Sequence, residues 1–380
     1  LQSHDYFIQA GIEAGYSYND DFNGTTQEGF GFFQLTKRGN RRCSAARAFL
    51  SPVLDRDNLT VVTEAKSSSI DFEGKKAVGV TYLKNGKKYH VRAACETIIS
   101  AGAVQTPQLL QLSGIGNPED LALHDIDCFH PLKGVGQNLQ DHLDIMVQYY
   151  CKDPKLSAAR YIKVTNMMRV LLQYMLFGNG PGTENGCIAG AFIKSRKDIE
   201  IPDLQFHFIP LILSDHGRKR LTEPGLSIHV SQLRPASRGE IRLASKNPLD
   251  SPSIKANYLS VRSDLDVLIE GVKLARKIFK ANIFSAILGE EFEASRDALS
   301  EDDIASFVRK NAETIYHPVG TCKMGNDDLA VVDDRLRVHG LDSLRIVDAS
   351  VMPTLIGGNT NAPTIMIAEK ASDMISRDNA

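Results

Sequence analysis

The sequence predicts an α/β chain of the α+β kind, built in two parts. Residues 96–102 (ETIISAG) form an apolar run that ends at a glycine, as a buried strand does before a helix. Residues 226–233 (LSIHVSQL) and 239–245 (GEIRLAS) alternate apolar and polar side chains, which predicts antiparallel strands with one buried face. Between residues 265 and 279 apolar side chains recur at i, i+3, i+4 and i+7, so a helix is expected to cover such a sheet.

The composition is that of a globular protein. The 380 residues are 42% hydrophobic and 24% charged, and 44 Lys+Arg against 46 Asp+Glu give a net charge of −2. This balance excludes a disordered chain and argues against nucleic acid as a partner. The six cysteines form no CxxC pair, so neither a disulfide framework nor a zinc ribbon is predicted, and a reducing compartment is expected.

Two segments could be mistaken for membrane or targeting elements. Residues 97–118 carry no charge, but glycines and prolines interrupt them, so a strand, turn and helix are predicted instead of a membrane span. Residues 1–15 have no initiator Met, no basic region and no apolar core, and no signal peptide is predicted.

Sheet signals dominate the first third of the chain. The β-branched runs 59–65 and 77–83 predict strands, and Asn85-Gly86 predicts a hairpin turn after the second of them. After the strand at 96–102, Thr106 is expected to cap a helix that Pro107 opens and Gly114 ends.

Helix signals dominate the last third. Ser263 is expected to cap the helix at 265–279, and Ser300 with Asp303 predicts a second capped helix. A short strand is predicted at 344–348, and Asn361 is expected to open a final helix that has Pro363 in its first turn.

The middle of the chain gives weaker signals. Residues 153–219 read as mixed loops, and 178–186 (GNGPGTENG) are the best candidate for a linker or lid.

Several common site motifs are missing from the sequence. There is no GxGxxG, no P-loop, no GxSxG elbow and no HExxH. His124, Asp127, Cys128 and His130 are metal-ligand residue types, but their spacing fits no common metal site. No metal is therefore expected, and hydrolase and NTPase functions lose their usual support.

Five ordered motifs resemble one family, the glucose-methanol-choline (GMC) flavoprotein oxidoreductases. The similarity extends from about residue 29 to the C-terminus and is nearest to the choline and alcohol dehydrogenase branch. The family's N-terminal βαβ unit with its glycine-rich FAD fingerprint has no counterpart, so the chain is expected to be N-terminally incomplete. The motifs are GAVQTPQLLQLSGIG (102–116), VGQNLQDH (135–142), RPASRGEIRLASKNP (234–248), HPVGTCKMG (317–325) and VDASVMPTLIGGNTNAPTIMIAEKASDMI (347–375).

The resemblance implies a domain plan. Residues 45–116 and 331–380 would form the FAD-binding portion, without its first βαβ unit. Residues 1–44 and 151–330 would form a substrate domain with an antiparallel sheet and helices, and residues 117–150 a connection that covers the flavin.

The resemblance also implies a reaction. FAD would accept hydride from the carbinol carbon of choline or a primary aliphatic alcohol, giving the aldehyde, while His317 removes the hydroxyl proton. An imidazole suits a base at neutral pH, although a lone His before Pro can also be purely structural. Asn361 would hydrogen-bond the substrate oxygen, and a helix-capping role is its alternative.

Further residues are assigned to the cofactor by the resemblance. The backbone at Asp348 and Ala349 would follow the FAD diphosphate, with an ordinary strand end as the alternative. Asn138, with Asp141 and His142, would belong to the flavin-covering loop or to a buried polar network. Ser67 would mark the strand that reaches the adenine. The expected contacts of the flavin edge are Thr360, Asn361, Ala362, Pro363 and Thr364, at the start of the last helix.

Other readings stay open at this point. The chain could be an inactive remnant without cofactor, or a lyase or decarboxylase on the same fold. The electron acceptor could be a quinone, a dye-type acceptor or oxygen, and a homo-oligomer is compatible with the sequence. The expected location is the cytoplasm, either free or peripheral at the inner face of the membrane.

Overall fold

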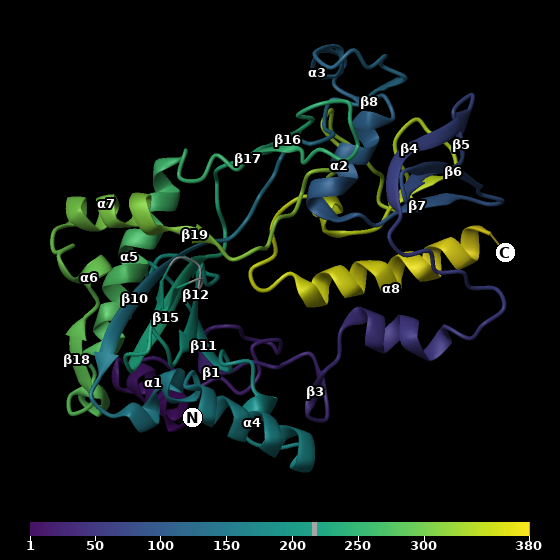
Figure 1. Cartoon of the computed structure of the whole chain (residues 1–380). Helices are drawn as coiled ribbons and strands as arrows, with labels where there is room; N and C mark the ends of the chain where they lie inside the picture. Colours follow the sequence, from purple (N-terminus) through teal and green to yellow (C-terminus); the bar gives the residue numbers. More distant parts are fainter. Residues whose placement is uncertain (215–218, 380) are drawn as a thin grey trace. The chain divides into compact units, whose positions relative to one another are not determined.

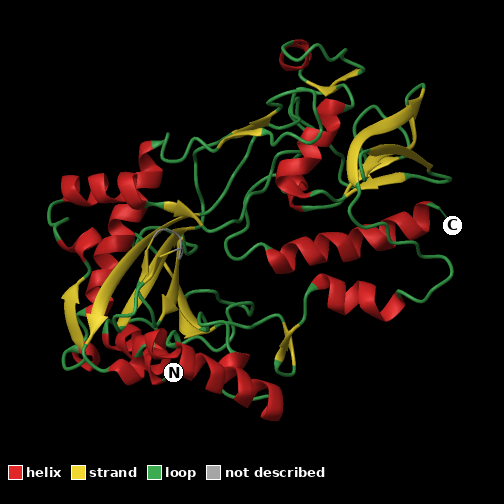
Figure 2. Ribbon diagram, viewed as in Figure 1, coloured by secondary structure: helices red, strands yellow, loops and turns green. Residues whose placement is uncertain are grey.

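The computed structural model describes every residue except 215–218 and 380, and it divides into two compact units (Figure 1). Unit 1 comprises Leu1–Pro52, His142–Arg234 and Val261–Ile315, and unit 2 comprises Val53–Asp141, Pro235–Ser260 and Tyr316–Ala380. Helices and sheets occur in both units, which confirms the predicted α/β class (Figure 2).

An antiparallel sheet forms the centre of unit 1. Its strand order is β1-β11-β12-β15-β10-β18, with β19 also paired to β10. The predicted strand at 226–233 is confirmed as β15. The strands are β1 (Gly29–Phe32), β10 (Leu143–Cys151), β11 (Ala189–Ile193), β12 (Leu204–Ile209), β15 (Gly225–Gln232), β18 (Leu288–Glu291) and β19 (Glu313–Thr314).

Two helices cover the apolar face of this sheet. Helix α1 (Gln2–Glu13) contacts β1 and β11, and α5 (Arg262–Phe279) contacts β15 and β10. Gly271 lies where α5 meets the sheet, since a Cβ there would come within 2.3 Å of Val230 Cγ1. The helix predicted at 265–279 is confirmed, but it begins earlier, after Val261, so the cap predicted at Ser263 is wrong.

A third helix packs on α5. Helix α7 (Glu301–Asn311) begins with the predicted capping box, in which Ser300 and Asp303 bond each other's backbone N–H. Unit 1 also contains the short elements β2 (Lys37–Arg38), β3 (Arg41–Arg42), β13 (Leu213–Ser214), β14 (Lys219–Arg220) and α6 (Glu293–Arg296).

The prediction of mixed loops over 153–219 is wrong for the parts of that stretch that form a helix and strands. It contains α4 (Val164–Phe177), β11 and β12, and residues 178–186 connect α4 to β11. Helix α4 was not predicted. None of its residues is fully buried, so its apolar side chains do not form a stripe that faces a core. Residues 215–218 of this stretch lie outside the described residues.

In unit 2, a three-stranded antiparallel sheet follows the order β4-β5-β6. Its strands are β4 (Lys66–Glu73), β5 (Lys76–Lys84) and β6 (Lys87–Arg92). Asn85 and Gly86 both have positive φ, at 51° and 72°, which confirms the predicted hairpin turn. The strand predicted at 59–65 is wrong, because these residues form no ladder and Glu64 has a φ of 55°.

A parallel strand pair positions the candidate site of unit 2. The strands predicted in 96–102 and 344–348 are confirmed as β7 (Thr97–Ile99) and β20 (Leu344–Ile346), and the two pair in parallel. Helix α2 (Gly102–Leu112) follows β7 and the short turn η7 (Ala349–Val351) follows β20. The last helix, α8, spans Asn361–Asp378 as predicted.

Helix α2 begins earlier than the sequence predicts. It starts at Gly102, so Thr106 does not cap it and Pro107 lies inside it. A proline there cannot donate a hydrogen bond to the Ala103 carbonyl. The Thr321 hydroxyl donates to that carbonyl instead, at 2.6 Å. The helix therefore continues through the proline.

The core of unit 2 joins these elements. Buried side chains from α2, β20 and α8, among them Leu110, Ile346 and Ile367, form one cluster with the loops at 319–355. The other elements of the unit are β8 (Ile115–Gly116), α3 (Pro118–Ala122), β9 (His130–Pro131), β16 (Glu240–Arg242) and β17 (Ser253–Lys255).

The units do not coincide with the predicted domain ranges, since residues 235–260 and 316–330 lie in unit 2. The binding roles assigned to those ranges stay a prediction. None of the described helices has the length and apolar character needed to cross a membrane.

Candidate active site

Asp348 joins the two turns that follow the parallel strands of unit 2. Its Oδ2 accepts hydrogen bonds from the Gly102 N–H at 2.9 Å and the Thr106 hydroxyl at 2.6 Å, and its Oδ1 accepts one from the Ser350 N–H at 2.8 Å. The side chain is only 6% exposed. Three donors thus hold one buried carboxylate, which fixes the β7–α2 turn against the β20–η7 turn.

These two turns leave open space for a bound ligand beside the protein backbone. Gly102 has a φ of 84°, and a Cβ built on it would find no atom within 4 Å. Both turns lie at the carboxyl ends of parallel strands, where ligands of open α/β sheets bind. The N–H groups at the start of α2 add a positive dipole end. The open space at Gly102 and the backbone N–H groups suit a diphosphate such as that of FAD, and the contacts expected at Asp348 and Ala349 stay a prediction.

The start of α8 has the electrostatic character that the flavin edge needs. This 18-residue helix has no side-chain cap at Thr360 and no acidic residue in its first turn. Asn361 and Ala362 are exposed, and Pro363 and Thr364 are partly exposed. The Thr364 hydroxyl donates to the Thr360 carbonyl at 2.7 Å. The helix N-terminus is therefore accessible to a group that carries negative charge.

His317 lies in a loop of unit 2 that is anchored through its backbone. The His317 N–H donates to Asp141 Oδ1 at 2.8 Å, and the Tyr258 hydroxyl donates to Asp141 Oδ2 at 2.5 Å. The preceding residue, Tyr316, has a φ of 64°. Asp141 thus fixes where the imidazole is placed, whereas the sequence predicted for Asp141 only a place in the flavin-covering loop or in a buried polar network.

Burial lowers the pKa of His317 below its ordinary value, and the nearby negative charge of Asp141 opposes this shift in part. The imidazole is therefore neutral at neutral pH. A neutral imidazole that remains partly accessible is the form that can accept a proton.

The structure brings Asn359 next to the imidazole, and the substrate-binding role expected of Asn361 stays a prediction. Asn359 Nδ2 lies 3.4 Å from His317 Nε2. The resemblance pointed to Asn361, and Asn359, two positions earlier, was not predicted. The repeated Asn in GGNTNAP was the signal that could have identified it.

The side chain of Asn138 forms hydrogen bonds with other residues of unit 2. Its Nδ2 donates to the carbonyls of Gly320 and Pro353 at 3.1 and 3.3 Å, and its Oδ1 accepts from Arg238 Nε at 3.1 Å. Its φ is 64°. These contacts match the polar-network alternative, and they leave the cofactor role of Asn138 as a prediction.

Ser67 is an exposed residue of β4, opposite Tyr82. Strand β4 is linked to α2 through the Ile70 N–H, which donates to the Ser113 hydroxyl at 2.9 Å. The expected adenine contact at this strand stays a prediction.

Unit 1 contains a polar cluster that the sequence analysis did not assign. His229 Nδ1 and Asp144 Oδ2 lie 2.5 Å apart on neighbouring strands of the sheet, and both side chains are largely buried. Asp144 Oδ1, His229 Nε2 and Ser231 Oγ are buried atoms for which the described residues provide no hydrogen-bond partner. Buried polar atoms of this kind are uncommon and call for an explanation, such as a ligand.

The polar positions of LDIMVQYY and LSIHVSQL were the available signal for this cluster. They place Asp144 and Gln148 on one side of β10, and Ser227, His229 and Ser231 on the same side of β15. Alternation alone reads as solvent exposure, but this face is buried.

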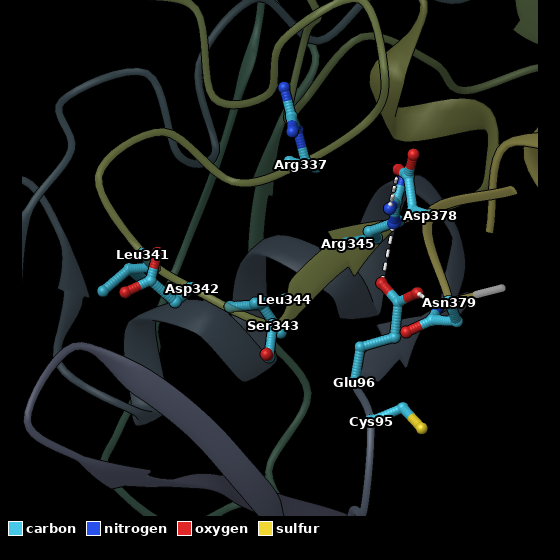
Figure 3. Close-up of a pocket in the computed structure, with 10 residues that line it drawn as sticks. All are labelled: Cys95, Glu96, Arg337, Leu341, Asp342, Ser343, Leu344, Arg345, Asp378 and Asn379. Atoms are coloured by element: carbon cyan, nitrogen blue, oxygen red, sulfur yellow. Dashed lines mark hydrogen bonds and ion pairs between the residues drawn. The ribbon is translucent and has the colours of Figure 1, made fainter.

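A cavity of about 490 Å³ lies at the opposite, amino ends of β7 and β20 (Figure 3). Arg345 crosses it and pairs with Glu96 Oε2 at 2.6 Å and Asp378 Oδ2 at 2.5 Å. None of the predicted site residues lines this cavity. Its paired charges fix the end of α8 to the sheet.

The described residues contain no group of three or more His, Cys, Asp or Glu arranged to hold a metal ion. All six cysteines are free thiols.

Comparison with known proteins gives matches along almost the whole chain. Two family models, both described as GMC oxidoreductase, match residues 2–144 and 235–368. An alcohol dehydrogenase [acceptor] from Pseudomonas putida is 46% identical over 98% of this chain and 68% of its own length. The oxygen-dependent choline dehydrogenase 1 of Chromohalobacter salexigens is 45% identical over 97% of this chain and 66% of its own length.

Solved structures also match this chain over almost its whole length. Pyridoxine 4-oxidase from Mesorbium loti matches with a TM-score of 0.88 and 26% sequence identity, and the match covers 99% of this chain and 70% of the oxidase chain. A formate oxidase has a TM-score of 0.90 and 25% identity, covering 98% and 70%. The chain thus spans about two thirds of the length of the proteins it matches.

Proposed function

Because this chain belongs to the GMC oxidoreductase family, we propose that it contributes the substrate-oxidising part of an FAD-dependent alcohol dehydrogenase. The proposed substrate is choline or a primary aliphatic alcohol, and the product is the aldehyde. The observation that carries the proposal is His317, whose pKa is lowered by burial and whose Nε2 lies near the Asn359 amide.

FAD, when bound, would supply the acceptor for the hydride that leaves the carbinol carbon. His317 would take the hydroxyl proton, so that the O–H bond breaks as an N–H bond forms on the imidazole. Asp141 would hold the loop in place through the His317 N–H.

The amide groups near His317 would orient the alcohol. Asn359 lies at the imidazole, and Asn361 opens α8 two residues later. An amide N–H can donate to an alkoxide oxygen without competing for the proton. Both asparagines are therefore proposed as substrate-orienting residues.

The proposed test begins with the absorbance spectrum of the chain after incubation with FAD and removal of the free cofactor. Bound flavin that is bleached by an n-alkanol or choline without oxygen supports the proposal. A chain that binds no flavin would support the inactive-remnant reading. Bound flavin that no alcohol reduces would support a lyase or decarboxylase.

The role of His317 is tested in the flavin-loaded enzyme. His317→Ala is expected to keep the flavin spectrum and slow its reduction by alcohol more than about tenfold, since a general base contributes about 10²- to 10⁴-fold. The matched control is His124→Ala, a partly exposed histidine of the same unit. An unchanged rate in His317→Ala would remove this residue from the mechanism.

A further inference from the structure

Helix α4 presents a broad apolar surface to the outside of unit 1. Its inward positions are Asn166, Val170 and Tyr174, and even these are only partly buried. The outward positions are apolar at a spacing that forms one continuous stripe. We call this stripe the α4 apolar face, and it consists of Met167, Met168, Leu171, Leu172, Met175 and Leu176.

The exposure of this face is unusual for side chains of its kind. Met175 and Leu176 are each 70% exposed, and Phe177 at the end of the helix is 73% exposed. Scattered exposed apolar residues are normal, but a contiguous apolar patch marks an interaction site.

A basic hairpin lies beside the end of α4. Asn40, at the turn between β2 and β3, donates through Nδ2 to the Gly178 carbonyl at 2.8 Å, and Lys37 Nζ donates to the Thr183 carbonyl at 2.7 Å. The hairpin consists of two cross-strand pairs, Lys37 with Arg42 and Arg38 with Arg41, and all four side chains are exposed. In Figure 1 this hairpin carries the label β3 and lies near the C-terminal end of α4.

Carboxylates are few around these cations, although Glu184 directly follows Thr183, whose carbonyl accepts from Lys37. The sequence has no Asp or Glu from residue 29 to 54 or from residue 155 to 183, while Lys155, Arg160, Lys163 and Arg169 add positive charge around the helix. Within the described part of the chain, no carboxylate is in ion-pair distance of the four hairpin cations. The α4 apolar face therefore has a positively charged border.

We propose that α4 and the β2–β3 hairpin bind the surface of an anionic phospholipid bilayer. An apolar helix face bordered by Lys and Arg is the pattern of a helix that lies in the membrane interface. The 14 residues of α4 span about 21 Å, short of the roughly 30 Å of a hydrocarbon core, so the helix lies in the plane of the interface. The hairpin cations would contact the headgroups.

A second copy of the chain suits this surface less well. A two-fold interface through the α4 apolar face would enclose two positively charged borders in one contact, and like charges disfavour association. Anionic headgroups complement both parts of the surface at once.

The test is co-sedimentation of the 380-residue chain with vesicles. We expect binding to phosphatidylcholine vesicles that contain roughly one third phosphatidylglycerol, and at least tenfold weaker binding to pure phosphatidylcholine. The binding should weaken between about 0.1 M and about 1 M salt, where the Debye length falls from about 10 Å to about 3 Å.

Matched variants assign the binding to this surface. Arg38→Gln/Arg41→Gln should weaken binding about tenfold or more, because each basic residue near an anionic surface strengthens binding about fivefold. The control Lys87→Gln/Lys88→Gln changes two exposed cations of another hairpin and should leave the binding unchanged. Circular dichroism establishes that each variant is folded.

The apolar contribution is tested separately. Leu172→Gln/Leu176→Gln should also weaken binding at least tenfold, whereas Leu249→Gln/Leu299→Gln, at two other exposed leucines, should not. The proposal is overturned if the unmodified chain does not bind or binds both kinds of vesicle equally. It is also overturned if either control variant weakens binding as much as the test variant to which it is matched. Absence of vesicle binding with dimerisation that Leu172→Gln/Leu176→Gln abolishes would assign the face to a second copy and would also overturn it.

Discussion

Asp348→Asn is expected to destabilise unit 2 strongly. In the native protein one carboxylate accepts from the Gly102 N–H, the Thr106 hydroxyl and the Ser350 N–H. The Asn side chain has the same shape but one acceptor oxygen, and its amide N–H groups would face donors. The buried carboxylate at 6% exposure leaves little room for water to replace the lost acceptor.

The magnitude follows from the number of bonds that are lost. A hydrogen bond to a charged group contributes about 1.5 to 3 kcal/mol, and a donor left buried without a partner costs about 1 to 3 kcal/mol. Thr106 and Ser350 are fully buried, whereas the Gly102 turn is partly exposed and can reach water. Asp348→Asn should therefore lower the free energy of unfolding by about 3 to 5 kcal/mol.

Urea unfolding followed by circular dichroism measures the total change, and hydrogen exchange of the peptides at 97–112 and 344–352 locates it. Both turns should exchange faster, because Asp348 joins them. Asp334→Asn, at an exposed aspartate of the same unit, is the control and should change stability by less than about 0.5 kcal/mol.

A Thr106→Val variant completes a double-mutant cycle with Asp348→Asn. Because the two side chains bond directly, the second substitution should cost less after the first, by about 1 to 2 kcal/mol. Additive effects, or an Asp348→Asn protein as stable as its parent, would refute the view that this carboxylate joins the two turns.

Three further predictions concern single groups. Because burial lowers the pKa of His317, the rate of flavin reduction by alcohol should rise with pH, with a midpoint below the ordinary histidine pKa, and be constant at higher pH. Asp141→Asn should move this midpoint to still lower pH, because the Asp141 charge raises the pKa of His317. A midpoint above the ordinary histidine pKa would contradict the prediction. His229→Ala should destabilise the chain by about 3 to 5 kcal/mol in urea unfolding, because it leaves the Asp144 carboxylate buried without its partner, whereas His90→Ala at the exposed His90–Asp71 pair should cost about 1 kcal/mol or less. Thr321→Val should lower the free energy of unfolding by about 1 to 3 kcal/mol, because the Ala103 carbonyl has no helix donor at Pro107; equal stability of this variant would show that water replaces the hydroxyl.

Elements whose sequence pattern reflects burial could be predicted. Helix α5 has a buried stripe that includes Leu268, Val272 and Ala275, so its spacing was visible, and the Ser300 cap of α7 is a local signal. Helix α4 lacks such a stripe and was missed. The run 59–65 has the composition of a strand, but strand formation needs a pairing partner, and no ladder forms there.

The start of α2 shows a different reason for error. Thr106 followed by Pro107 is a sound local signal for a helix start. A residue distant in sequence overrides it, since Thr321 supplies the missing donor to Ala103, and Asp348 uses the Thr106 hydroxyl for another purpose. Neither the Thr321–Ala103 nor the Thr106–Asp348 contact can be recognised from the short stretch of sequence around the helix start.

The candidate site divides in the same way. His317 and Asp141 were each named from a separate motif, but the hydrogen bond between them could not be predicted from the sequence. Asn359 and Asn361 are equivalent as residue types, and the contact of the Asn359 amide with the imidazole is visible only in the fold. Asp144 and His229 become a pair only through the register of β10 and β15, where Asp144 lies opposite Ser231 and diagonal to His229. A shift of the register by one residue would turn His229 toward the helices and leave Asp144 without a partner, so this pair depends on tertiary structure alone.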